Sequence, residues 1–99
     1  MKLQIQSIHF DADKKLLEFV QKKLDKLDTF HDRILDAEVF LKVDNGEKKE
    51  NKLINVKVNI PGNSLIAKEQ AATFEEATDK VVENLKAQIK KQKERAAAH

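Results

Sequence analysis

The sequence predicts an α+β two-layer sandwich with the element order β-α-β-β-β-α and a four-stranded sheet that carries both helices on one face. Four stretches alternate apolar and polar residues, as strands do, and two stretches space apolar residues three and four apart, as helices do. Each predicted strand is apolar on only one side, so both helices should cover that side. The 99 residues suit one domain, which we expect over residues 1–95, followed by a frayed tail over residues 96–99.

The first half of the chain predicts one strand and one helix. Residues 3–7 alternate between apolar and polar side chains, which is typical of a half-buried strand. Residues 9–13 then turn the chain, and either Asp11 or Asp13 can cap the next helix. That helix is expected over residues 14–29, because its apolar residues follow a helical period. They are Leu16, Leu17, Val20, Leu24 and Leu27.

Three strands are expected next, over residues 35–43, 54–60 and 64–71. A turn begins at residues 44–46 and continues as a charged loop, while Pro61-Gly62 occupies the positions that a type II turn favours. The helical crossover allows the first strand to lie parallel to the second, and strands two to four should form an antiparallel meander.

The last third of the chain, residues 74–95, predicts one long helix with a single buried stripe. The stripe contains Phe74, Ala77, Thr78, Val81, Leu85 and Ile89, with Val82 at its margin. Acids crowd the first turns and bases dominate the later ones, an arrangement that complements the helix dipole.

Lysines form rows on the sides of both helices that point away from the sheet. The rows are Lys86, Lys90 and Lys93 on one surface of the last helix, Lys80, Lys91 and Arg95 on its other flank, and Lys15, Lys22 and Lys26 on the first helix, with Lys23 beside them. Rows of this kind are often solvated faces and nothing more. Two adjacent rows, with many acids collected on the sheet and on its hairpin near Glu47 and Glu50, favour instead a surface that binds RNA phosphates.

Composition limits the classes of protein that fit. Charged residues make up 36% of the chain but the net charge is only +2, so any affinity for nucleic acid must depend on where the charges lie. The absence of cysteine excludes a disulfide framework and thiolate chemistry. The alternating N-terminus is no signal peptide, and no apolar run approaches the ~18 residues of a membrane span. We expect a cytoplasmic domain with no membrane partner.

Residues suited to catalysis are sparse. The three histidines are scattered without metal-ligand spacing, and the two glycines form no phosphate-binding loop. His31 and Asp32 could act as a base and its orienting group, but a solvated turn fits this junction better. Phe40 lies with Ile66 on the open face of the sheet, where an aromatic ring could stack on a base, although a cross-strand contact is the favoured interpretation. We expect no enzymatic activity, cofactor, metal or small-molecule substrate.

A family resemblance runs collinearly from Leu3 to Arg95. Its segments are Glu18-Phe19-Val20, Lys23-Leu24-Asp25-Lys26-Leu27, Phe30-His31-Asp32-Arg33-Ile34, Pro61-Gly62, residues 71–79 and residues 85–93. Together they resemble the ribosome hibernation-promoting factors, also called ribosome-associated inhibitors or sigma-54 modulation proteins. The resemblance implies a fold similar to that of double-stranded-RNA-binding domains. Because the chain ends after the second helix, it resembles the short form, expected to be a monomer off the ribosome.

The resemblance also implies which residues face ribosomal RNA. Lys23, Lys26, Arg33, Lys91 and Lys93 match basic positions of the family, and Asp79 matches a structural aspartate. The chain departs from the family at Asn84 and Ala87, where basic residues are usual, and at Glu69, where a small inward residue is common. Lys86 and Lys90 supply charge one turn away from the lost positions. The expected rRNA-binding set is Lys22, Lys23, Lys26, Arg33, Lys80, Lys86, Lys90, Lys91 and Lys93.

The residues and the resemblance together predict a translation inhibitor without enzymatic activity, acting in the stress response and in stationary phase. The expected partners are the small ribosomal subunit with its 16S-type rRNA, and other ribosome-silencing factors. The protein would occupy the decoding channel of idle ribosomes and block mRNA and tRNA. Two alternatives stay open: a general structured-RNA-binding module acting off the ribosome, and a small adaptor or enzyme that uses the exposed sheet face.

Overall fold

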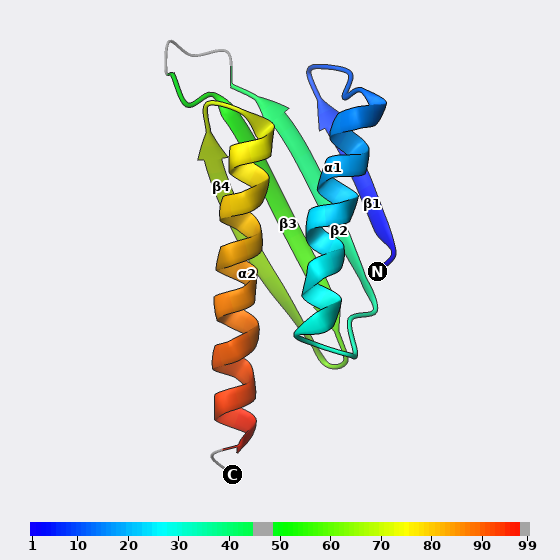
Figure 1. Cartoon of the computed structure of the whole chain (residues 1–99), viewed down its shortest axis with the longest axis vertical. Helices are drawn as coiled ribbons and strands as arrows, with labels where there is room; N and C mark the ends of the chain where they lie inside the picture. Colours follow the sequence, from blue (N-terminus) through cyan, green and yellow to red (C-terminus); the bar gives the residue numbers. More distant parts are fainter. Residues whose placement is uncertain (45–48, 98–99) are drawn as a thin grey trace.

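The computed structural model describes residues 1–44 and 49–97, with side chains as far as residue 94, and its elements follow the predicted order (Figure 1). They are β1 (Leu3–Ile8), α1 (Lys14–Asp25), the 3₁₀ helix η1 (Lys26–Thr29), β2 (Asp36–Val43), β3 (Lys52–Ile60), β4 (Asn63–Ala71) and α2 (Phe74–Ala97). The turn predicted at Asn45-Gly46, and the acid Glu47, lie outside the described residues.

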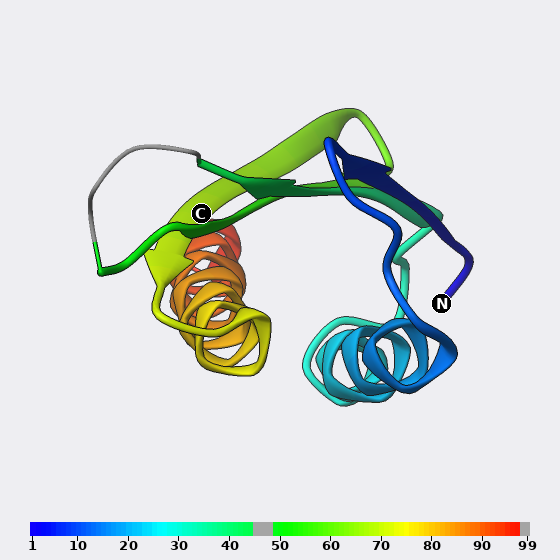
Figure 2. The ribbon, with the colours of Figure 1, turned by 90° about the horizontal axis from the view of Figure 1, so that it is seen from above.

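The four strands form one mixed sheet in the order β1-β2-β3-β4. β1 pairs in parallel with β2, and the β2–β3 and β3–β4 pairs are antiparallel. One register row crosses all four strands through Ile5, Val39, Val56 and Ala67. Figure 2 shows both helices beneath the same face of this sheet, side by side. The predicted α+β two-layer sandwich, its parallel first pair and its meander are therefore confirmed.

The core lies between the sheet and the helices and uses the side chains that the alternating patterns predict. Its buried apolar residues are Val20, Leu24, Leu27, Ala37, Val39, Leu41, Ile54, Val56, Val58, Ile60, Leu65, Ala67, Ala71, Phe74, Ala77, Val81, Val82, Leu85 and Ile89. The stripe of α2 is the predicted one. Its single hydroxyl, on Thr78, is buried without cost because it donates to the Phe74 carbonyl oxygen at 2.7 Å.

Individual residues determine the turn between β3 and β4 and the start of α1. Gly62 has φ +75°, as the third residue of a type II turn requires, and Pro61 precedes it. A primed hairpin turn would need a positive φ at Pro61, which the proline ring forbids. Of the two acids that could cap α1, Asp13 does so, because its Oδ1 accepts from the Leu16 backbone N–H at 2.8 Å.

Several predicted boundaries differ from the structure, and β3, for example, begins at Lys52 rather than at residue 54. The first helix was expected to stay α-helical to residue 29, but α1 ends at Asp25 and the last turn tightens into η1, a common C-terminal ending that the hydrophobic period cannot distinguish. β2 begins one residue after Leu35, whose side chain is 61% exposed rather than inward. Leu35 lies where the chain enters the sheet, and its backbone N–H donates to the Asn59 carbonyl oxygen at 2.8 Å. α2 continues through Ala97 rather than ending at residue 95.

Neither helix of the described chain combines the length and the hydropathy that a membrane span needs.

Candidate nucleic-acid interface

The two helices are joined on their shared layer by contacts between residues far apart in the sequence. Phe10, from the loop before α1, stacks on Phe74 at the start of α2, with 4.9 Å between ring centroids. Further along, Lys23 Nζ lies 3.3 Å from Asp79 Oδ1. These contacts fix the spacing of the two helices, and with it the spacing of the lysines they carry.

A third contact joins α2 to the end of η1. Lys86 Nζ lies 4.8 Å from the centroid of the Phe30 ring, in a cation–π arrangement. Because Lys90 and Lys93 follow Lys86 at the i+4 and i+7 positions, the three lysines form one row on the side of α2 that faces α1. All three are exposed. The predicted row is therefore exposed and lies away from the buried stripe, on the side of α2 toward the neighbouring helix.

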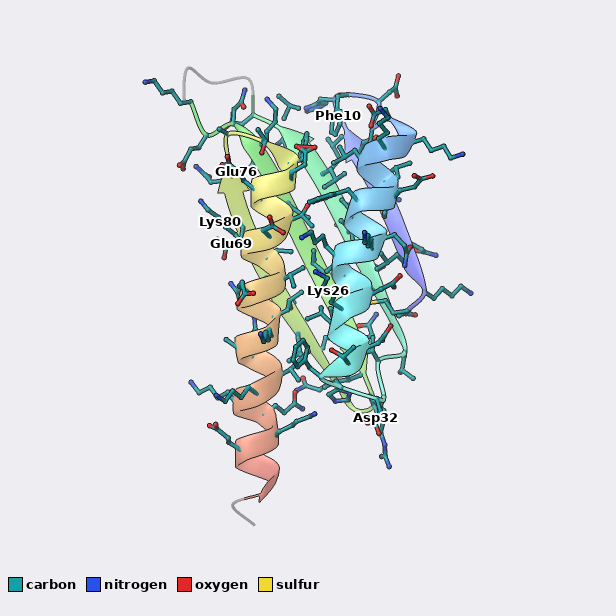
Figure 3. The ribbon with its side chains drawn as sticks, viewed as in Figure 1. Phe10, Lys26, Asp32, Glu69, Glu76 and Lys80 are labelled. Atoms are coloured by element: carbon teal, nitrogen blue, oxygen red, sulfur yellow. The ribbon has the colours of Figure 1, made fainter. Side chains whose placement is uncertain are left out.

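On α1 and η1, Lys23 and Lys26 face the same region. Lys23 is held, with its side chain only 29% exposed, by Asp79 and by the Phe19 ring, whose centroid is 5.4 Å from Lys23 Nζ. Lys26 follows one turn later and is exposed. Figure 3 marks it near the lower end of the first helix, alongside α2. We call the exposed surface that carries Lys23, Lys26, Lys86, Lys90 and Lys93 the interhelix face.

The remaining predicted basic residues lie elsewhere. Lys80 and Lys91 line a shallow groove on the opposite flank of α2, beside β4, together with Glu69 and Glu83. Figure 3 shows Lys80 and Glu69 together on that side, and Lys80 Nζ donates to the Gln70 carbonyl oxygen at 3.1 Å. This flank is of mixed charge, so it is a weaker attractor for phosphate than the interhelix face.

Two more predicted residues stand apart from both flanks of α2. Lys22 borders a groove between α1 and β1 whose floor includes Leu3 and Ile5. Arg33 is exposed in the connection between η1 and β2. The structure therefore distributes the predicted binding set over several parts of the surface.

The acids at the end of the first helix are directed away from the interhelix face. Asp25 Oδ1 and Asp28 Oδ2 accept from the N-terminal ammonium of Met1, at 2.9 and 2.7 Å. These hydrogen bonds raise the pKa of the ammonium above its usual value of 8.0, and the one to Asp28 has the largest effect. Asp25 and Asp28 therefore form ion pairs with the Met1 ammonium, next to β1. Asp79 is the acid that pairs with a lysine of the interhelix face, Lys23.

Lysines of the interhelix face other than Lys23 are free to meet an anionic partner. Within residues 1–44 and 49–94, no carboxylate lies within ion-pair distance of Lys26, Lys86, Lys90 or Lys93. In the same part of the chain, no three His, Asp or Glu side chains gather closely enough to hold a metal ion. The arrangement of exposed lysines is suited to neutralising phosphates.

Comparison with known proteins identifies the family. The model of the sigma 54 modulation protein / S30EA ribosomal protein family matches residues 3–97, nearly the whole chain. The chain belongs to this family. Within it, the chain is 32% identical over 93 residues to a ribosome hibernation promotion factor of Deinococcus radiodurans, covering 93% of this chain and 49% of that protein. The chain thus spans about half the length of this relative.

Solved structures support the fold assignment for this S30EA family member. A ribosomal subunit interface protein from Coxiella burnetii superposes with a TM-score of 0.83 at 22% identity, over 94% of this chain and 98% of that one. The N-terminal domain of Thermus thermophilus Protein Y superposes with a TM-score of 0.76 at 29% identity, over 91% of this chain and 93% of that one.

Sequence reasoning missed two features of the site. The first is Phe30, which was part of the family resemblance but whose contact with Lys86 has no signal in the pattern of either segment. The second is the pairing of two positions that depart from the family: Asn84 Nδ2 donates to Glu69 Oε2 at 2.9 Å. The inward position of Glu69 on β4 was readable from the alternation, and an inward carboxylate signals that a polar partner must lie opposite.

Proposed function

We propose that this chain is a ribosome hibernation factor that binds the small ribosomal subunit in the decoding channel and blocks mRNA and tRNA there. The observation that carries the proposal is the interhelix face, where lysines of two helices are held at fixed spacing and Lys26, Lys86, Lys90 and Lys93 have no competing carboxylate within the described residues. Membership of the S30EA family, and the name of the Deinococcus relative, support a role at the ribosome.

The proposed mechanism is steric and electrostatic. Ribosomal RNA presents phosphates at spacings fixed by its fold, so a rigid pair of helices can neutralise several of them without reading sequence. Each phosphate neutralised releases counterions, which gives affinity that falls as salt rises. The body of the domain, about 47 × 24 × 19 Å, then occupies volume that mRNA and tRNA would need. No bond is made or broken, so inhibition should be fully reversible on dissociation.

Four basic residues outside the interhelix face would add to this contact. Lys22, Arg33, Lys80 and Lys91 could reach RNA that wraps beyond the interhelix face, because a channel surrounds its occupant on several sides. We assign them smaller contributions, since Lys80 and Lys91 share their flank with Glu69 and Glu83.

The experiment that tests this proposal is a competition. Purified small subunits are mixed with the protein before and after they are loaded with mRNA and initiator tRNA, and bound protein is measured by cosedimentation. Binding to empty subunits that is lost on loading is the expected result. Undiminished binding to loaded subunits would end the channel proposal and favour an RNA contact elsewhere, and failure to bind empty subunits would end the ribosomal proposal altogether.

A further inference from the structure

The end of the first helical segment exposes an aromatic ring beside a cation. The chain has five phenylalanines and neither tyrosine nor tryptophan. Phe10, Phe19 and Phe40 are half-buried and Phe74 is 7% exposed, whereas Phe30 is 36% exposed. Burial in the core therefore does not explain why an aromatic residue stands at position 30, directly after η1.

The surroundings of Phe30 are basic. Lys86 Nζ lies 4.8 Å from the ring centroid, Lys26 precedes Phe30 by one turn, and Arg33 follows it in the exposed connection to β2. Of the nearby acids, Asp28 is held by the Met1 ammonium at 2.7 Å, and Asp32 points away from the body of the molecule in Figure 3. A partner that meets this ring is therefore drawn in by cations, and an acidic or phosphate-bearing partner fits best.

We propose that Phe30 and Lys86 form a stacking platform for one unpaired nucleobase of the bound RNA. Bases in loops and bulges stack on aromatic side chains, and a cation next to the ring can contact the phosphate of the same nucleotide. Lys86 keeps the ring in place from the α2 side, so the platform exists before the RNA arrives. This inference rests on the proposed function, since it names the kind of RNA feature that the interhelix face reads.

The platform has a consequence for selectivity. A row of lysines alone binds any RNA of suitable shape, but a stacking residue favours a site with an unstacked base at one end of the row. A perfectly paired duplex offers no such base. The domain should therefore prefer folded RNA with a bulge or loop over a duplex of equal charge.

Affinity measurements on matched variants test the platform. Phe30→Leu keeps an apolar side chain but removes the ring, Phe30→Tyr keeps the ring, and Phe40→Leu makes the same change on the open sheet face. Loss of one stacked base corresponds to about 5- to 150-fold in affinity. We expect Phe30→Leu to bind empty small subunits at least about fivefold more weakly, with Phe30→Tyr and Phe40→Leu close to wild type. Circular dichroism confirms that each variant is folded.

A direct spectroscopic readout separates stacking from a structural effect. Because the chain has no tryptophan, Phe30→Trp and Phe40→Trp each introduce a single one, which can be labelled as 5-fluorotryptophan and followed by ¹⁹F NMR free of ribosomal background. On addition of small subunits, the resonance at position 30 should shift far more than the resonance at position 40. Titration with a single-stranded adenine oligonucleotide and with a duplex of equal charge should shift it only for the single strand.

Each result decides a different question. If Phe30→Leu binds like wild type while replacing Lys86, Lys90 and Lys93 by Gln weakens binding, the platform is wrong and the proposed function stands. If Phe30→Leu weakens binding but neither RNA shifts the resonance at position 30, the ring has only a structural role and the platform is again wrong. If wild type binds neither small subunits nor the single strand, both proposals fail.

Discussion

Replacing Lys86, Lys90 and Lys93 together by Gln should weaken binding to the small subunit and flatten its dependence on salt. The three residues span about 10 Å along the axis of α2, at a rise of 1.5 Å per residue. Lys90 and Lys93 are exposed, and Lys86 is exposed while resting on Phe30. Glutamine forms helices about as well as lysine, so the fold should survive the change.

The size of the effect follows from counterion release. Each phosphate neutralised contributes about 0.9 to the slope of log affinity against log salt on a duplex. Three contacts therefore give a slope change of about 2.7, or about 2 if Lys86 stays on the Phe30 ring. Between 50 and 200 mM salt, a slope difference of 2.7 means that wild type loses about 40-fold more affinity than the variant.

The assay is a salt titration of small-subunit binding, with a control matched in charge. Lys42, Lys57 and Lys68 are exposed on the open sheet face, so replacing them by Gln changes the net charge from +2 to −1, as the first variant does. The control should retain the wild-type slope to within about one unit, because its lysines face away from the helices. Equal slopes for wild type and the α2 variant would refute the assignment of the interhelix face, whatever the family.

Three further predictions concern stability. Leu85→Ala, at a fully buried position of α2, should lower the free energy of unfolding by about 2–5 kcal/mol in urea denaturation, and a loss below 1 kcal/mol would contradict the packing described here. Asp13→Ala removes the N-cap of α1 and should cost about 0.5–2 kcal/mol in the same assay, whereas Asp11→Ala should cost little. The Met1 ammonium has a raised pKa in the folded state, so its contribution to stability is complete below pH 8.0 and is lost as pH rises through the higher folded value. Stability should therefore fall more steeply above pH 8 in wild type than in Asp28→Asn, and parallel pH profiles would show that the contact contributes nothing.

Periodicity was sufficient to predict the fold because each element buries one face only. Alternation placed Val39 and Val56 inward, and the helical period placed Leu85 inward, without any knowledge of their neighbours. The helical crossover then allowed β1 to lie parallel to β2, as it does. At Leu35, just before β2, the backbone N–H still bonds to the Asn59 carbonyl oxygen, but the side chain has left the regular pattern.

The candidate site was less predictable, because its geometry depends on contacts that periodicity does not encode. The helical wheel grouped Lys86 with Lys90 and Lys93 correctly, but it could not show which neighbour that side of α2 would face. The pairing of Lys23 with Asp79, and the placement of Lys86 on Phe30, join positions separated by more than half of the chain. Only the docking of both helices on one sheet face brings these partners together.

The positions that depart from the family meet on the β4 flank of α2. Glu69 points inward from β4, and its carboxylate accepts from Asn84 Nδ2 at 2.9 Å. Gln88 Nε2 in turn donates to Asn84 Oδ1 at 2.7 Å and to the Ile66 carbonyl oxygen at 2.9 Å. Asn84 therefore supplies the polar partner that an inward Glu69 needs, which makes the two departures interdependent.

The hydrogen bonds among Glu69, Asn84 and Gln88 also explain why position 84 can lack the basic residue usual in the family while the proposed binding face is kept. Asn84 and Ala87 line the shallow groove beside β4, together with Lys80 and Lys91. The absence of basic residues at these two positions weakens the charge of a flank that Glu69 already makes mixed. The interhelix face keeps its lysines, so the proposed RNA contact is concentrated there.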